Sequence, residues 1–204
     1  MGRFVPISFV QLLTAVVFAF NLASPGLADQ YKRAKFQKSG WSTKGGMTIR
    51  HQILAARAMG KFILYDNGSS KKVVLGTWRD EMTGLVYRAE NPFRLLEIDH
   101  LIPLKWAWDH GAENWDYAKR NKFANDRRFL LITAKSVNGS KSEKGADLYL
   151  PINRDLACTY LVKFQEGVME YDLKPTASES TLMNIYEKDV CRKDQYTAAL
   201  GSDG

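Results

Sequence analysis

The stretch LLEIDHLIPLKWAWDHGAENW, Leu95–Trp115, decides which fold this chain can adopt. Its first part is an apolar run with a strand pattern that reaches Asp99 and His100, and Pro103 follows closely. On a regular strand, neighbouring side chains point to opposite faces of the sheet. Asp99 and His100 can therefore meet at one ligand only if the strand ends or bends there, which the proline favours.

Strand and helix patterns on both sides of this stretch predict a mixed set of elements. Apolar runs with strand character occupy residues 71–78, 84–90, 93–102 and 128–133. Helices are predicted within residues 47–62, 115–126, 151–173 and 178–193. After the fourth strand, residues 134–147 are rich in turn and capping residues, so a polar turn and then a short helix are predicted there. If the third and fourth strands pair antiparallel, Asp99 and His100 come close to the polar turn that contains Asn138.

The first 28 residues have the organisation of a secretory signal peptide. A basic residue, Arg3, precedes a mostly apolar run at 10–23, and the small-residue pattern Gly-Leu-Ala follows at 26–28. A membrane anchor is the alternative, but the run is short for the ~20 residues that cross a bilayer. We therefore expect cleavage after Ala28, a mature chain without membrane attachment, and a secreted or periplasmic location.

Two cysteines, Cys158 and Cys191, are far apart in the sequence and fit no close-spaced zinc pattern. Export to an oxidising compartment favours a disulfide between them. The alternative is a pair of inert, buried thiols.

Basic residues are concentrated near the start of the expected mature chain, and the formal net charge of the whole sequence is +7. The segment QYKRAKFQKSGWSTKGG, residues 30–46, places aromatic residues between its positive charges. Such a segment can lie along a polyanion. The alternative is a solvated, partly disordered arm.

Several separated motifs agree in order with one known family. The run EIDHLIPLKWAWDHGAENW, followed by RNKFAND and LLITAKSVNGSKSEKGADLYLP, resembles the HNH, or ββα-metal, nuclease core. More narrowly, it is similar to secreted HNH proteins related to the C-terminal domain of GmrSD-type restriction enzymes. The upstream GTWRDEMTG, residues 76–84, and the downstream helix with Cys158 also resemble that family.

The resemblance implies an α+β fold built on a ββα-metal (HNH) core, with flanking helices and an additional N-terminal strand and helix region. Residues 29–204 would form a single HNH nuclease-like domain. Its core would span about 94–150, and a C-terminal helical pair would occupy 152–193.

The resemblance also implies a chemistry that suits these residue types. Phosphodiester hydrolysis needs an activated water and stabilisation of negative charge on oxygen. A neutral histidine takes a proton near neutral pH, so His100 is the expected general base. Asp99 and Asn138 match the family's metal-binding positions, and hard cations prefer such oxygen ligands. Magnesium is the expected cofactor, with manganese as a substitute.

The expected substrate is nucleic acid, DNA in preference to RNA, cut by a monomeric enzyme with little sequence specificity. Positive side chains that flank the motif would contact its backbone. Lys141 is the foremost candidate because it follows the Asn138 turn, and the others are Arg120, Lys122, Arg127, Arg128 and Lys135. The two other histidines, His51 and His110, are not expected to be catalytic.

The chain departs from the family pattern at two places. Phe129 stands where the family's middle Asn organises the loop, and NGSKSEKG replaces the usual NRSKG. We expect the Phe129 ring to pack under the loop, beside Trp106 or Phe123, and to restrain it by burial. The alternative function is a secreted nucleic-acid-binding protein on a degenerate, non-catalytic HNH scaffold. A zinc-stabilised module is disfavoured because two cysteines and three scattered histidines offer no four-ligand spacing.

Overall fold

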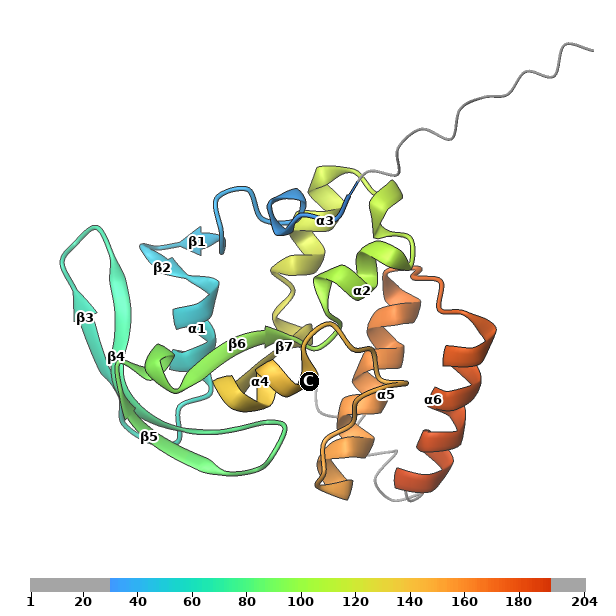
Figure 1. The fold of residues 1–204 in the computed structure, drawn as a ribbon. Coiled ribbons are helices and arrows are strands. Elements are labelled where there is room, and N and C mark those ends of the chain that lie inside the picture. The colour runs from blue at the N-terminus through green and yellow to red at the C-terminus, as the bar shows by residue number, and fades with distance from the viewer. Residues whose placement is uncertain (1–29, 192–204) are drawn as a thin grey trace, which may run out of the picture. The chain divides into compact units, whose positions relative to one another are not determined.

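Strands β6 (Leu96–His100) and β7 (Leu130–Ala134) pair antiparallel, and the helix α4 (Lys135–Lys141) follows β7 directly. The register sets Asp99 opposite Leu131 and His100 opposite Leu130. Strand β6 ends at His100, as the nearby Pro103 predicted. Figure 1 shows α4 lying beside this pair of strands.

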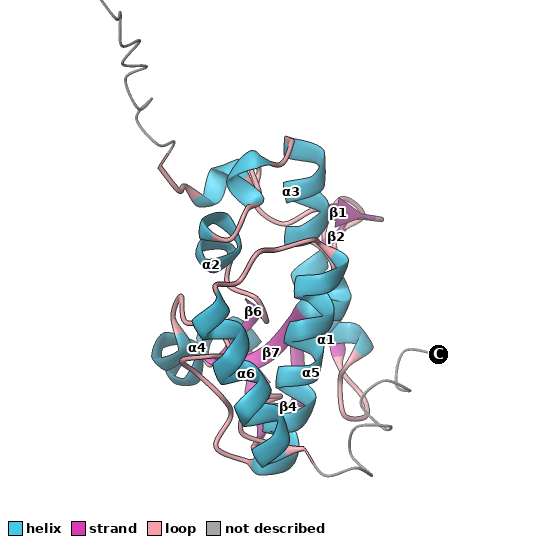
Figure 2. Ribbon diagram, turned by 90° about the vertical axis from the view of Figure 1, so that its right-hand side faces the viewer, coloured by secondary structure: helices cyan, strands magenta, loops and turns pink. Residues whose placement is uncertain are grey.

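The computed structural model describes residues 30–191, so the predicted signal peptide, residues 1–28, lies outside the described residues. Helices and strands of the mixed α+β class surround the β6–β7–α4 unit (Figures 1 and 2). The other strands are β1 (Thr43–Lys44), β2 (Met47–Thr48), β3 (Ile63–Asp66), β4 (Lys71–Arg79) and β5 (Val86–Glu90). The other α-helices are α1 (Ile49–Ala56), α2 (Leu104–Asp109), α3 (Tyr117–Ala124), α5 (Arg154–Glu170) and α6 (Ala177–Val190). Short 3₁₀ turns are η1 (Arg33–Lys35), η2 (Pro92–Arg94), η3 (Ala112–Asn114) and η4 (Arg127–Phe129).

The two faces of the β6–β7 pair belong to two different apolar clusters, as the alternation of a strand requires. One face packs with α1 and β4, and its buried residues include Leu54, Trp78, Ile98 and Ile132. The other face contributes Leu131 to a larger cluster with α2, α3, α5 and α6. The site at the end of β6 is therefore supported from both sides.

The C-terminal helices α5 and α6 lie side by side (Figure 1) and are joined by a disulfide between Cys158 and Cys191, as predicted. Thr176 caps α6: its hydroxyl accepts from the Glu179 N–H, and the Glu179 carboxylate accepts from the Thr176 N–H in return. Tyr160 of α5 donates a hydrogen bond to the Leu101 carbonyl at 3.3 Å, which ties the pair to the chain just after β6.

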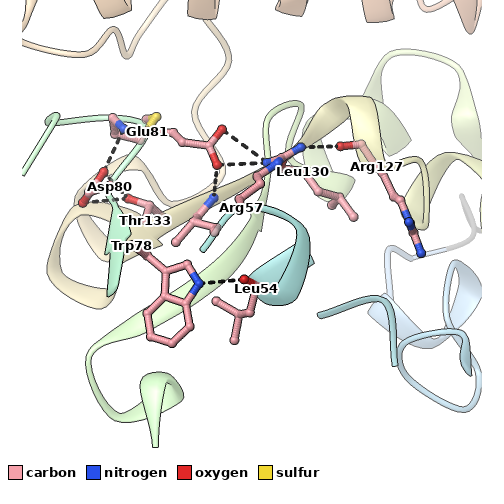
Figure 3. A network of polar contacts seen from close by, with 10 residues as sticks. Leu54, Arg57, Trp78, Asp80, Glu81, Arg127, Leu130 and Thr133 are labelled. Carbon is pink, nitrogen blue, oxygen red and sulfur yellow. Dashed lines mark hydrogen bonds and ion pairs between the residues drawn. The ribbon is translucent and has the colours of Figure 1, made fainter. Parts of the chain in front are cut away.

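The turn between β4 and β5 holds the outer edge of β7 through two carboxylates, those of Asp80 and Glu81 (Figure 3). Asp80, which is fully buried, accepts from the backbone N–H of Ala134 at 2.8 Å. Glu81 accepts from the backbone N–H of Ile132 at 3.0 Å and forms an ion pair with Arg57. The motif GTWRDEMTG, residues 76–84, therefore anchors the strand that leads into α4.

We expect Asp80→Asn to lower the free energy of unfolding by roughly 1–3 kcal/mol, the cost of leaving a buried donor without its acceptor. The amide nitrogen of asparagine would face the Ala134 N–H or the N–H groups of Met82 and Thr83, which Asp80 also holds. Urea titration of the purified protein measures the change. Asp66→Asn is the matched control, because Asp66 caps an exposed turn; an equal loss in both variants would contradict the anchoring role.

Candidate functional site

His100, the last residue of β6, is held on two sides. Its Nε2 lies 2.9 Å from the backbone carbonyl of Ala124, at the end of α3. Its ring stacks on the Trp41 ring with centroids 5.1 Å apart and planes 7° apart. Because the side chain is only 5% exposed, the imidazole has a fixed position at the end of the strand.

The hydrogen bond fixes the tautomer of this imidazole. A carbonyl oxygen can only accept, so Nε2 carries the proton and Nδ1 retains its lone pair. Burial lowers the pKa of His100 to about 3, the positive charge of Arg33 acts in the same direction, and the hydrogen bond to Ala124 opposes both. The ring is therefore neutral near pH 7 and able to accept a proton through Nδ1.

Asp99 is buried beside the fully buried ammonium group of Lys141, which belongs to the last turn of α4. Lys141 Nζ lies 2.8 Å from Asp99 Oδ2 and donates a hydrogen bond to the His100 carbonyl, also at 2.8 Å. The Asp99 contact is an ion pair without directed hydrogen-bond geometry, so Oδ2 has no hydrogen-bond partner. Burial raises the pKa of the Asp99 carboxyl, and the Lys141 charge opposes that rise.

Asn138, in the middle of α4, faces the same end of the strand. Its Nδ2 donates to Glu97 Oε2 at 2.6 Å, which leaves the amide oxygen Oδ1 for another partner. Glu97 precedes Asp99 by two residues and so lies on the same face of β6. An acidic strand face and an amide from the following helix thus meet at one place.

Two cavities at the end of β6, beside Asn138, share five lining residues. The larger has a volume of about 370 Å³ and the smaller about 280 Å³. Both are lined by Arg33, Glu97, Asp99, His100 and Asn138. Neighbouring side chains of a regular strand would point to opposite faces, but β6 ends at His100. Asp99 and His100 therefore border the same cavities, and Asn138 borders them as well.

The structure corrects the expectation that Lys141 contacts substrate from the surface. Its side chain is fully buried, and its ammonium group is used by Asp99 and by the His100 carbonyl. A lysine near a polar turn looks solvated in the sequence, but α4 directs this one into the interior.

Four of the other basic residues that were expected to contact the substrate are Arg120, Lys122, Arg127 and Arg128. Among the lining residues of the two cavities, all within residues 30–191, none of these four is found. Arg120 donates to the Ala112 and Glu113 carbonyls. Arg128 forms ion pairs with Asp126 and Glu170. The basic residues that do line the cavities are Arg33, Arg50, Lys105 and Lys135.

Phe129 is buried, as expected, in the same apolar cluster as Trp106 and Phe123. Its ring neighbour is Tyr171, with centroids 6.1 Å apart. Its backbone carbonyl accepts from the Leu101 N–H at 2.9 Å, one residue after the imidazole. The position of the family's middle Asn is thus occupied by a packed ring.

The other two histidines have structural partners. His51 Nδ1 accepts from the Val73 N–H at 3.1 Å. His110 bridges the Trp106 carbonyl and the Glu179 carboxylate, which joins α2 to α6. Neither lines the cavities beside His100, so His100 is the histidine of this site.

The site thus consists of a neutral imidazole, a carboxylate and an amide at the end of a strand–strand–helix unit. The chain belongs to the family described as "GmrSD restriction endonucleases, C-terminal domain", whose model matches residues 50–184. This match confirms the predicted relation to the C-terminal domain of GmrSD-type restriction enzymes. An uncharacterized secreted protein from Arthroderma benhamiae is similar, with 29% identity over 160 residues, which cover 78% of this chain and 74% of that protein. No solved structure matches the chain at a significant level.

Among residues 30–191, no helix combines the length and the apolar character needed to cross a membrane.

Proposed function

We propose that this chain is a secreted, divalent-metal-dependent endonuclease with an HNH (ββα-metal) core formed by β6, β7 and α4. The observation that carries the proposal is the His100 imidazole, whose Nε2–H is bound by the Ala124 carbonyl while Nδ1 remains an acceptor. The family name supplies the reaction class, and the relative's description as a secreted protein agrees with the predicted signal peptide. Nucleic acid, DNA in preference to RNA, is the proposed substrate.

The donor set fits a hard divalent cation that keeps most of its water. Within residues 30–191, no group of three or more His, Cys, Asp or Glu side chains gathers as a metal site. The Asp99 carboxylate and the Asn138 amide oxygen are instead two oxygen donor groups that border one cavity. Magnesium is bound in this manner, through one or two carboxylates together with water and substrate phosphate. Asp99 and Asn138 would hold it, and manganese is the expected substitute.

The chain's own residues would act as follows. His100 Nδ1 takes a proton from the attacking water, and the new P–O bond forms as the bond to the leaving oxygen breaks. The Ala124 carbonyl and the Trp41 ring keep the imidazole plane fixed during this transfer. Glu97 holds the Asn138 amide, and Lys141 holds Asp99. A bound divalent cation supplies stabilisation of negative charge on the phosphate oxygens.

Plasmid nicking with and without a chelator tests the proposal. We expect cleavage by the exported protein in magnesium or manganese, loss of cleavage in chelator, and recovery when metal is added back. Asn138→Ala should remove most of the metal-dependent cleavage because one metal ligand is lost. Asn184→Ala is the matched control, since this asparagine lies on the exposed side of α6.

Binding of the plasmid without cleavage in any divalent metal would contradict the enzyme and favour the alternative, a non-catalytic binding protein. Cleavage that persists undiminished in chelator would contradict the metal requirement.

A further inference from the structure

Two arginines outside the β6–β7–α4 unit reach the cavity beside His100. Arg33 lies in η1, and Arg50 lies in the first turn of α1. Both line the smaller cavity together with His100 and Asn138. The N-terminal region therefore contributes positive charge to the space where the reaction would occur.

The segment that carries Arg33 is anchored to the fold, in contrast to a solvated arm. Phe36, three residues later, is fully buried, and its carbonyl accepts from Asn121 Nδ2 at 3.1 Å. The neighbouring Gln37 is also buried, and its Nε2 donates to the Ala124 carbonyl at 3.3 Å. That carbonyl is the one that receives the imidazole N–H, so the segment and the proposed general base share one anchor point.

Each arginine lies over an aromatic ring. The Arg50 guanidinium carbon lies 3.8 Å from the centroid of the Phe93 ring. The Arg33 guanidinium carbon lies 6.0 Å from the centroid of the Trp41 ring, the ring that stacks on the imidazole. Contact with the Phe93 ring face restrains the Arg50 guanidinium and leaves its N–H groups available for an anion.

Among the described residues, neither of these two guanidinium groups is in a direct ion pair, although the Glu97 carboxylate borders the same cavity. Within residues 30–191, neither guanidinium forms an ion pair or a hydrogen bond, and the Arg50 Nε is buried without an acceptor. Burial lowers the pKa of Arg50, the Glu97 carboxylate opposes this, and the charge of Arg33 adds to it. Like charges directed at one cavity repel each other, so an anion between them would be stabilised by both.

We propose that Arg33 and Arg50 form a clamp for a backbone phosphate of the nucleic-acid substrate, next to His100. A guanidinium group offers parallel N–H donors that match the oxygens of a phosphate. The clamp rests on the proposed function for the substrate class, and it assigns the substrate contacts to the N-terminal region in place of Arg120, Arg127 and Arg128. The N–H donors of the clamp would contact the phosphate alone, so the clamp would contribute equally to the binding of nucleic acid of any base sequence.

Binding of a fluorescent DNA oligonucleotide to the full exported protein, measured by anisotropy in chelator over a range of salt concentrations, tests the clamp without any cleavage. Arg33→Gln and Arg50→Gln should each weaken binding by about tenfold or more, as loss of a charged hydrogen bond implies. Each should also reduce the slope of log affinity against log salt by about one. Arg88→Gln, which removes an exposed arginine of β5, is the matched control and should change affinity less than about twofold, because an exposed charge away from the ligand contributes little.

The clamp would be overturned if Arg33→Gln and Arg88→Gln had the same affinity for the oligonucleotide and the same salt slope. It would also be overturned if the unmodified protein did not bind the oligonucleotide. Arg33 is exposed, so its variant tests the clamp even if Arg50→Gln impairs folding. The result also separates the two proposals. Arginine-dependent binding without cleavage supports the clamp and contradicts the nuclease, whereas cleavage unaffected by both substitutions supports the nuclease and contradicts the clamp.

Discussion

Replacement of His100 with alanine is expected to lower the rate of nucleic-acid cleavage by about 10²–10⁴-fold, the usual contribution of a general base. The reason lies in the geometry: Nε2–H is bound by the Ala124 carbonyl, so the buried, neutral ring keeps Nδ1 as its proton acceptor. The same variant should still bind metal, because Asp99 and Asn138 are unchanged. Plasmid cleavage measures the first effect, and calorimetric titration with magnesium or manganese measures the second.

His51→Asn is the control for this experiment. The Nδ1 of His51 accepts a backbone N–H, and the asparagine Oδ1, which is bonded to the same carbon position, can still accept it. We expect its cleavage rate to stay within a few-fold of the unmodified protein, because it does not line the cavities. Cleavage by His100→Ala at an undiminished rate, in a protein with an unchanged melting temperature, would refute the proposed role of the imidazole.

Replacement of Lys141 with methionine is expected to lower the free energy of unfolding by about 3–5 kcal/mol, the typical cost of removing one partner from a buried ion pair. Methionine fills much of the same volume, so the loss arises from the Asp99 carboxylate left without its ammonium neighbour. The hydrogen bond to the His100 carbonyl is lost as well. Urea denaturation followed by tryptophan fluorescence gives the value.

A double-mutant cycle isolates the ion pair from the packing. Asp99→Asn removes the charge that Lys141 neutralises, so the pair of substitutions together should cost less than the sum of the two alone. Strictly additive losses would show that Lys141 acts through packing or through the His100 carbonyl. The Lys105–Asp109 pair on the surface of α2 is a suitable comparison, because exposed ion pairs contribute only ~0–1 kcal/mol.

The elements with clear periodicity were predictable from the sequence. The β4–β5 hairpin, the β6–β7 pair and the helices α1, α3, α5 and α6 follow from apolar spacing and caps. The strand β3 was not predicted, because all four of its residues are exposed and so show no alternation. The helix α2 was missed because most of its six residues are buried, which removes the polar face that marks a helix.

The site was predictable only where its residues are close in the sequence or belong to a motif. The family pattern indicated Asp99, His100 and Asn138. Glu97 could have been found as well, since it lies two residues before Asp99 on the same strand face. The approach of Arg33 and Arg50 depends on long-range packing of the N-terminal segment, and no local pattern carries that information.

The two carboxylates of the β4–β5 turn also affect how this protein behaves in a crowded solution. An open sheet edge displays free N–H groups that can pair with a strand of another molecule, which leads to aggregation. On β7 the edge N–H groups of Ile132 and Ala134 are already bound by Glu81 and Asp80. A second chain therefore finds carboxylates where it would need free backbone groups, and the strand that leads into α4 is protected from intermolecular pairing.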